Sequence, residues 1–177
     1  MPTGKNKVPM APLRAALEAA GLREVRTYIQ SGNVIVTTGL KPAVVERLAH
    51  DVIREKFGGD ITVISRLPDY LKNVLAGCPF KKALAGTGAD TARLYFTFLA
   101  TMPDSALLRA FLASGCAPDR IEIVGDMAYI LCATKYSDAK INNSIIERKL
   151  KLRATTRNYN TVTSLIALTG RKTSRLG

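Results

Sequence analysis

The chain has 177 residues, with 26 lysines and arginines against 14 aspartates and glutamates, which gives a net charge of +12. Its apolar fraction of 47% excludes a disordered chain, and no run approaches the ~18 consecutive apolar residues of a membrane-spanning helix. The three cysteines are widely spaced, and the first ten residues lack the apolar segment of a secretion signal. We therefore expect a folded cytoplasmic protein with reduced thiols.

The first half of the chain alternates helical and β-rich segments. Apolar residues three and four positions apart predict the helices, and a glycine between two β-rich runs predicts a hairpin. The predicted elements are a helix over 12–20, a hairpin over 25–37, a helix over 42–57, a strand over 61–64 and a helix that begins at Pro68.

The second half begins after the small and flexible segment 85–90, where we place the domain boundary. Asp104 is the expected cap of its first helix, and Asn158 or Asn160 that of its last. The predicted elements are a strand over 92–100, a helix after Asp104, a hairpin over 120–133, a helix after Asp138, a short extended segment over 153–156 and a final helix.

The two halves share one order of elements, except that the first half lacks its opening strand. The order β-α-β-β-α-β is that of the split βαβ, or ferredoxin-like, arrangement. We therefore predict an α+β protein with two tandem ferredoxin-like (α/β-plait) halves, each with an added C-terminal helix. The two predicted domains are 1–85, in which the first strand is missing, and 86–177.

Three sequence blocks resemble a known family. GKNKVPM (4–10), VRTYIQSGNV (25–34) and TTRNYNTV (155–162) are similar, in order and spacing, to the signature blocks of the bacterial family called domain of unknown function 1697. The resemblance implies tandem α/β-plait subdomains and implies no activity. Members of that family usually begin with an apolar strand and an RGIN-type turn before the GKNK block. We therefore expect an upstream strand, or a first sheet that rearranges or borrows a strand.

Basic residues concentrate near the end of the chain, where residues 140–177 hold nine lysines and arginines against the single acid Glu147. Such an excess attracts nucleic acid, phosphorylated metabolites or acidic partners, although it is also typical of solvated helix faces. Amides and hydroxyls close to the cations suit a phosphate or carboxylate, and the alternative is helix capping plus surface charge. The candidates here are Lys140, Asn143, Lys149, Arg153, Thr156, Arg157, Asn158 and Asn160.

Two further groups of candidates lie earlier in the chain. A loop carrying Lys5 and Lys7 could hold an anion, or be a plain solvated loop. Alternating cations, amides and aromatics could line an open sheet face, as in RNA-binding domains, unless the two sheet faces pack on each other or on the added helices. Those sheet residues are Arg26, Tyr28, Gln30, Asn33, Arg93 and Tyr95.

The sequence offers little for catalysis. The single histidine, His50, lies beside Asp51 inside a predicted helix, and no GxSxG motif supplies a nucleophile. The cysteines lack zinc-ligand spacing and no GxGxxG motif occurs. We therefore predict no catalytic residue, no metal site and no cofactor.

The leading hypothesis is a non-enzymatic binding protein for an anionic partner, with nucleic acid as the main candidate and no membrane contact. One alternative is an enzyme or sensor for a small phosphorylated or carboxylated metabolite bound between the subdomains. Another is a protein–protein assembly module. The sequence leaves the oligomeric state open.

Overall fold

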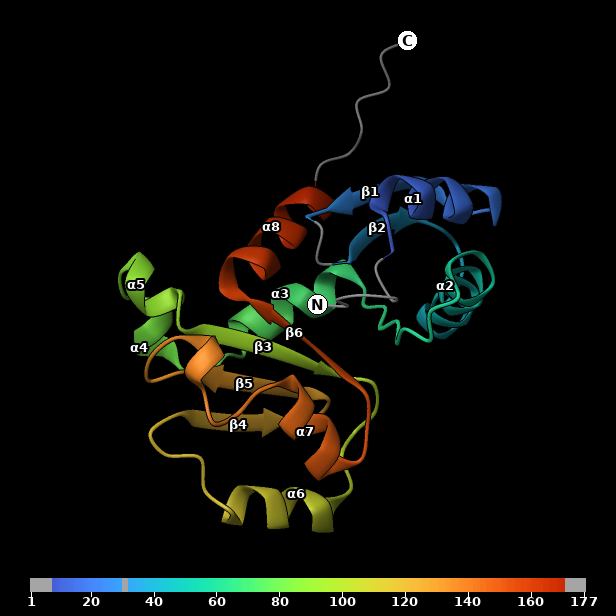
Figure 1. Ribbon diagram of the computed structural model, residues 1–177. Coiled ribbons are helices and arrows are strands. Elements are labelled where there is room, and N and C mark those ends of the chain that lie inside the picture. The colour runs from blue at the N-terminus through green and yellow to red at the C-terminus, as the bar shows by residue number, and fades with distance from the viewer. Residues whose placement is uncertain (1–7, 30–31, 171–177) are drawn as a thin grey trace. The chain divides into compact units, whose positions relative to one another are not determined.

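The structure is a computed structural model that describes residues 8–29 and 32–170 (Figure 1). Within these ranges it has two antiparallel sheets, one of two strands and one of four, together with eight α-helices and a short 3-10 helix. The chain divides after Leu67 into two compact units.

The N-terminal unit packs two helices on one face of a hairpin. Its elements are α1 (Met10–Ala19), β1 (Arg23–Tyr28), β2 (Asn33–Thr37) and α2 (Pro42–Phe57). Thr27 pairs with Val34 and Tyr28 with Asn33, which confirms the predicted hairpin. The apolar face contributes to a buried cluster of Leu13, Leu17, Leu22, Val25, Ala49 and Ile53.

The predicted strand over residues 61–64 is wrong. This segment has no regular secondary structure, and the sheet of the N-terminal unit has only β1 and β2 among the described residues. Ile61 and Val63 still pack against the apolar cluster. Their apolar side chains are half-buried, but no neighbouring strand among the described residues pairs with this backbone, and pairing is what makes an extended segment a strand. The tandem of two ferredoxin-like halves is therefore not confirmed.

The C-terminal unit contains the four-stranded sheet, with strand order β4-β5-β3-β6 and all neighbours antiparallel. Its order of β3, α6, β4, β5, α7, β6 and α8 is the one predicted for this part of the chain. The elements are α3 (Pro68–Ala76), α4 (Lys81–Leu84), α5 (Gly88–Thr91), β3 (Leu94–Leu99), α6 (Ser105–Ala113), β4 (Arg120–Val124), β5 (Met127–Leu131), a 3-10 turn (Tyr136–Asp138), α7 (Asn143–Leu150), β6 (Ala154–Asn158) and α8 (Tyr159–Gly170).

Side chains cap the first turns of α6, α7 and α8. The carboxylate of Asp104 accepts hydrogen bonds from the backbone N–H groups of Ala106 and Leu107 at 2.9 and 3.0 Å, which confirms it as the cap of α6. Asn158 caps α8 in the same way. Asn142, rather than the predicted Asp138, caps α7. Each cap satisfies N–H groups that a helix leaves without partners in its first turn.

The helix α3 belongs to the C-terminal unit, so this unit begins at Pro68 and not at residue 86. The Tyr70 hydroxyl donates a 2.6 Å hydrogen bond to the carboxylate of Asp126, in the turn between β4 and β5. The Tyr129 hydroxyl of β5 donates to the backbone oxygen of Val74 at 3.2 Å. These contacts join residues more than fifty positions apart, which no local signal in the sequence reveals.

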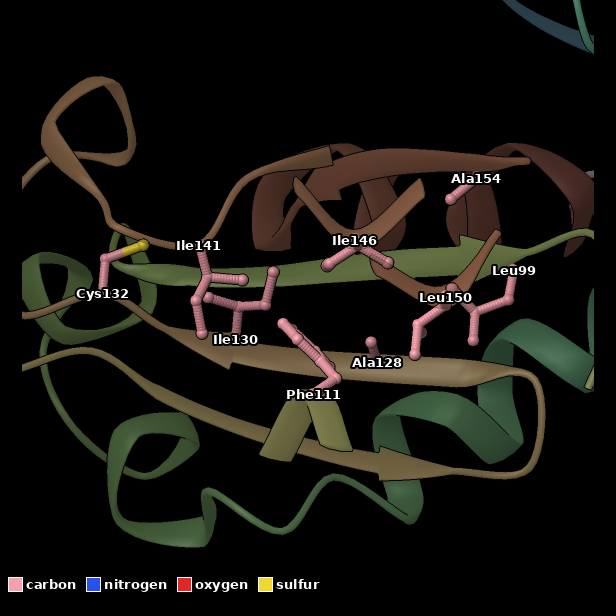
Figure 2. Packing of buried hydrophobic residues seen from close by; sticks show 9 residues of the cluster. All are labelled: Leu99, Phe111, Ala128, Ile130, Cys132, Ile141, Ile146, Leu150 and Ala154. Atoms are coloured by element: carbon pink, nitrogen blue, oxygen red, sulfur yellow. The ribbon is translucent and has the colours of Figure 1, made fainter. Parts of the chain in front are cut away.

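Helices cover both faces of the four-stranded sheet. On one face, Phe111 of α6 and Ile146 and Leu150 of α7 pack on Ala128 and Ile130 (Figure 2). The other face presents fully or nearly fully buried rings and aliphatic side chains, covered by α3, the segment at Phe80, and α8: Leu94, Phe96, Phe98, Met127 and Tyr129. This sheet therefore has no open aromatic face. It agrees with the alternative prediction, in which the sheet faces pack on helices.

Candidate anion-binding site

Two polar side chains of the predicted site, Asn143 and Thr156, connect α7 to the sheet. The Thr156 hydroxyl donates to Asn143 Oδ1 at 3.0 Å and lies 2.8 Å from the hydroxyl of the fully buried Thr97. The amide nitrogen of Asn143 donates to the backbone oxygen of Ala154 at 3.2 Å. Because these groups satisfy one another inside the protein, Asn143 and Thr156 have a structural role.

The following residues also have structural roles. Arg157 is half-buried on β6, where its Nη1 donates to the hydroxyl of Thr155 at 2.5 Å and to the backbone oxygen of Thr156 at 2.8 Å. Burial lowers the pKa of Arg157, because a charged guanidinium is less well solvated there. Asn158 accepts the N–H of Thr161 at 2.8 Å as the cap of α8. Asn160 is exposed in the first turn of that helix.

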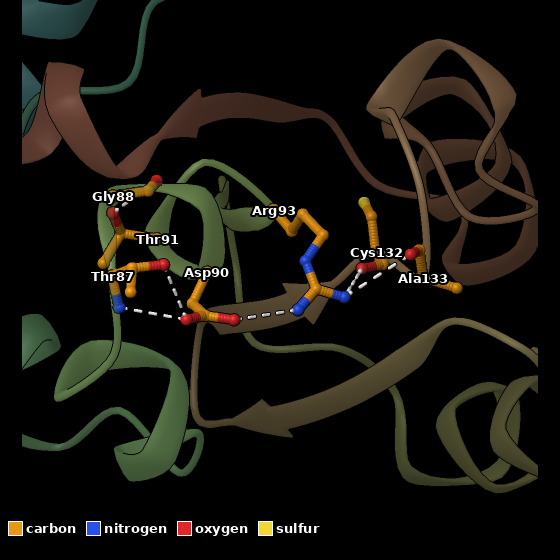
Figure 3. A network of polar contacts seen from close by, with 7 residues as sticks. All are labelled: Thr87, Gly88, Asp90, Thr91, Arg93, Cys132 and Ala133. Carbon is orange, nitrogen blue, oxygen red and sulfur yellow. Dashed lines mark hydrogen bonds and ion pairs between the residues drawn. The ribbon is translucent and has the colours of Figure 1, made fainter.

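The side chains of Arg93 and Tyr95, at the start of β3, make contacts within the protein. Arg93 Nη2 lies 3.1 Å from Asp90 Oδ1, and its Nη1 donates to the backbone oxygen of Ala133 at 3.4 Å (Figure 3). The N–H and hydroxyl of Thr87, together with Arg93, lower the pKa of Asp90. The ring of Tyr95 stacks on Tyr136 with 4.3 Å between centroids.

The remaining early candidates belong to the N-terminal unit. Arg26 and Tyr28 are half-buried on β1, on the face opposite the apolar cluster. Asn33 is buried, and its amide nitrogen donates to the backbone oxygen of Tyr28 at 3.3 Å across the hairpin. This bond is the turn-stabilising role that such an amide commonly has. The predicted candidates Lys5, Lys7 and Gln30 lie outside the described residues.

Four exposed cations surround the C-terminal end of α7, and we call Arg148, Lys149, Lys151 and Arg153 the basic turn. Their neighbouring carboxylate, Glu147, accepts the backbone N–H of Ala154 at 2.9 Å. Within the described ranges, none of the four cations pairs with a carboxylate. The basic turn therefore carries concentrated positive charge toward solvent.

Lys149 and Arg153 of this surface are predicted site residues, and Arg148 and Lys151 are their neighbours in the sequence. All four side chains are exposed in the structure. Lys140 is exposed, but it precedes the N-terminal end of α7, where its backbone N–H donates to the buried carboxylate of Asp119 at 2.7 Å. Since α7 begins at Asn143 and the basic turn begins at Arg148, more than one helical turn separates Lys140 from the basic turn.

The fold also creates a basic pocket that the sequence analysis did not include. A pocket of about 340 Å³ in the C-terminal unit is lined by Pro79, Phe80, Lys81, Lys82, Ala83, Arg120 and Leu131. Its cations come from α4 and from the start of β4, 38 or more positions apart in the chain. The packing of Phe80 against Arg120 brings them together, so the one local signal was the Lys81-Lys82 pair.

Among the described residues, the histidine and two of the cysteines have shifted pKa values. His50 Nε2 lies 3.0 Å from Asp60 and its Nδ1 lies 3.5 Å from Asp51, and both carboxylates raise the pKa of His50. Burial raises the pKa of Cys132 to about 11 and also raises that of Cys78, which leaves both thiols protonated and unreactive.

The part of the chain that the structure describes contains no group of three or more histidine, cysteine, aspartate or glutamate side chains that could hold a metal ion. Among its helices, none combines the length and the apolar character needed to cross a membrane.

Comparison with known proteins gives a family and a fold. The conserved bacterial protein SP0830 from Streptococcus pneumoniae has a similar structure, with a TM-score of 0.71 and 22% sequence identity over 97% of this chain and 94% of that chain. No curated protein matches the sequence. The family model described as protein of unknown function (DUF1697) matches residues 2–129, and the chain therefore belongs to this family.

Proposed function

We propose that this chain is a non-enzymatic cytoplasmic protein that binds a polyanion, with nucleic acid as the class of partner, through the basic turn. The observation that carries the proposal is the exposure of four cations within six residues, none of them paired with a carboxylate in the described structure. Cations that lack a protein partner keep their charge available to phosphates. A row of phosphates is the partner that uses several such cations at once.

The backbone at Lys151 supports this assignment. Lys151 follows the last residue of α7 in the left-handed conformation, with φ at +53°, where its N–H donates to the backbone oxygen of Glu147. Glycine is the common residue at such a position, and a residue with a Cβ costs about 1 kcal/mol more there. The chain thus places a cation at the helix end despite an unfavourable backbone conformation.

Helix stabilisation explains only part of the basic turn. Arg148 and Lys149 lie in the last turn of α7, where cations interact favourably with the partial negative charge of the helix end. Arg153 lies beyond the helix, directly before β6, and this interaction falls off within one turn. The exposure of Arg153 is therefore better explained by a partner than by the stability of α7.

The packing of the four-stranded sheet indicates how the partner is bound. We read residues 94–158 as a ferredoxin-like sheet whose platform face is occupied by α3 and α8. RNA-binding domains of this type stack bases on exposed aromatics of that face. Here Phe96 and Phe98 are buried, and Tyr95 stacks within the protein on Tyr136. We therefore propose binding through phosphates, with little dependence on base sequence.

The proposal is tested by fluorescence anisotropy of labelled single-stranded RNA and of a labelled DNA duplex, titrated with the protein at several salt concentrations. The label belongs on the nucleic acid because the chain has no tryptophan. Four phosphate contacts predict a slope of log K against log salt of about −3.6 for a duplex and about −2.8 for a single strand.

A matched pair of variants locates the binding surface. The double variant Lys149→Gln with Arg153→Gln removes two charges from the basic turn, and Arg109→Gln with Lys135→Gln removes two exposed charges elsewhere in the same unit. The first should weaken binding and reduce the slope by nearly two, and the second should change little. Equal losses in the two variants would mean that only net charge matters and would overturn the assignment to the basic turn.

A further inference from the structure

We propose that the pocket at Phe80 and Arg120 is a second, separate site that binds a small organic phosphate. The pocket has a volume of about 340 Å³ and lies wholly within the C-terminal unit. Three of its seven lining residues are cations, none is an acid, and the others are apolar. This mixture of a few charged groups and an apolar wall is typical of sites for small ligands.

Arg120 is held in place and still has its hydrogen-bond donors available. Its guanidinium lies over the ring of Phe80, 4.9 Å from the ring centroid. The side chain is exposed, and it donates no hydrogen bond to any described residue. The contact with the ring limits the motion of the guanidinium plane, and the planar fork matches two oxygens of a phosphate or carboxylate.

The two lysines of the pocket have different environments. Lys81 Nζ donates to the backbone oxygen of Ala76, the last residue of α3, so its ammonium group is fixed beside the pocket. Lys82 is exposed and has no partner among the described residues. Glu122 lies two positions after Arg120 on β4 and does not line the pocket. One ammonium that is held by a hydrogen bond and one without a protein partner are therefore available to the anion, together with the guanidinium.

A phosphate monoester fits this lining better than a carboxylate does. It carries a charge of about −1.5 to −2 and three terminal oxygens, which can each meet one of the three cations. The organic group of the ester can contact the apolar residues Pro79, Ala83 and Leu131. The volume is near the lower end of the range for ligand pockets, about 300–1,000 Å³, which favours a small ester.

The pocket and the basic turn lie at opposite ends of the sheet, so they can be tested separately. Leu131, which lines the pocket, pairs with Leu94 at the start of β3. Ala154, which follows the basic turn, pairs with Leu99 at the end of the same strand. The six residues of β3 place these ends about 17 Å apart.

The test is an NMR titration of the amide signals of the isotope-labelled full chain with three probes: phenyl phosphate, inorganic phosphate and benzoate. We expect saturable shifts at residues 79–83, 120 and 131, with phenyl phosphate binding several-fold tighter than either other probe. Arg120→Gln should weaken the binding of phenyl phosphate about tenfold or more, since it removes a charge-assisted hydrogen bond. Arg109→Gln is the matched control and should leave the affinity unchanged.

Several results would overturn this proposal. They are benzoate binding as tightly as phenyl phosphate, shifts confined to residues 148–153, or an affinity that Arg120→Gln leaves unchanged. If Arg120→Gln does not fold, the affinity of Lys82→Gln for phenyl phosphate is the test. The exposed side chain of Lys82 has no contact that folding requires. An unchanged affinity in Lys82→Gln would then contradict the proposal, and a loss would support it. Neither result depends on whether the basic turn binds nucleic acid.

Discussion

The hydroxyl oxygens of Thr97 and Thr156 lie 2.8 Å apart on the neighbouring strands β3 and β6. Since the Thr156 hydroxyl donates to Asn143, the hydroxyl of Thr97 is the donor between the two threonines. A chain of hydrogen bonds thus links the buried centre of the sheet to α7. Two residues that the sequence suggested as ligand contacts, Asn143 and Thr156, belong to this internal chain.

Thr156→Val should therefore destabilise the fold without affecting binding. The substitution keeps the shape of the side chain but leaves the Thr97 hydroxyl and Asn143 Oδ1 without their partner. We expect the free energy of unfolding to fall by about 1–3 kcal/mol, the cost of leaving buried polar groups unsatisfied. Urea unfolding measures this loss, and anisotropy at a temperature where the variant is folded should give the parent affinity. An unchanged urea midpoint would show that the hydrogen-bond chain contributes nothing.

Substitutions of Lys151 separate backbone strain from charge. Lys151→Gly should raise the free energy of unfolding by about 1 kcal/mol, since glycine adopts the left-handed conformation without a Cβ clash. The same variant should weaken polyanion binding, because it removes one cation of the basic turn. Lys151→Ala is the matched control, with the same loss of charge and no relief of strain. Equal stabilities of the two variants would contradict the account of this position.

The histidine in α2 should give a small dependence of stability on pH. Contacts with Asp60 and Asp51 raise the pKa of His50 above its usual value of about 6.5. Because the folded-state pKa is the higher one, the stabilisation is fully present below pH of about 6.5 and is lost as the pH rises through the folded pKa. Asp60→Asn should move the pKa of His50 down in an NMR titration. A pKa that stays where it was would exclude Asp60 as the main cause.

The three thiols should differ in reactivity. Cys78 and Cys132 are fully buried, and burial raises the pKa of both, to about 11 for Cys132. Cys116 is only half-buried. Alkylation of the native protein at pH 8, followed by mass spectrometry, should therefore modify Cys116 first, while Cys78 and Cys132 react only after denaturation. Rapid modification of Cys132 in the native state would contradict the packing around it.

Local patterns in the sequence predicted much of the fold. The hairpin at residues 25–37 follows from its glycine turn, the cap at Asp104 from its residue type, and the order of elements between Leu94 and Asn158 from their periodicity. Residues 61–64 show where this reasoning stops. Their composition is that of a strand, but a strand also needs a partner, and pairing is not a local property.

The candidate sites were harder to predict for the same reason. Whether α3 and α8 cover the sheet depends on contacts such as that between Tyr70 and Asp126, far apart in the chain. Hydroxyl and amide side chains near cations can bind a ligand or stabilise the fold. Their hydrogen-bond partners in the folded protein distinguish the two roles. Charges that are close in the sequence, such as Lys149 and Arg153, could be recognised from the sequence. That Lys82 and Arg120 line the same pocket could not.

The most direct test of the central claim is the affinity for a DNA duplex between about 50 and 200 mM salt, measured for the parent chain and for Lys149→Gln with Arg153→Gln. Four phosphate contacts at the basic turn predict a slope of about −3.6 for the parent and about −1.8 for the double variant. The control Arg109→Gln with Lys135→Gln should keep the parent slope. A slope that is the same in all three proteins would contradict the claim that this surface contacts the phosphates.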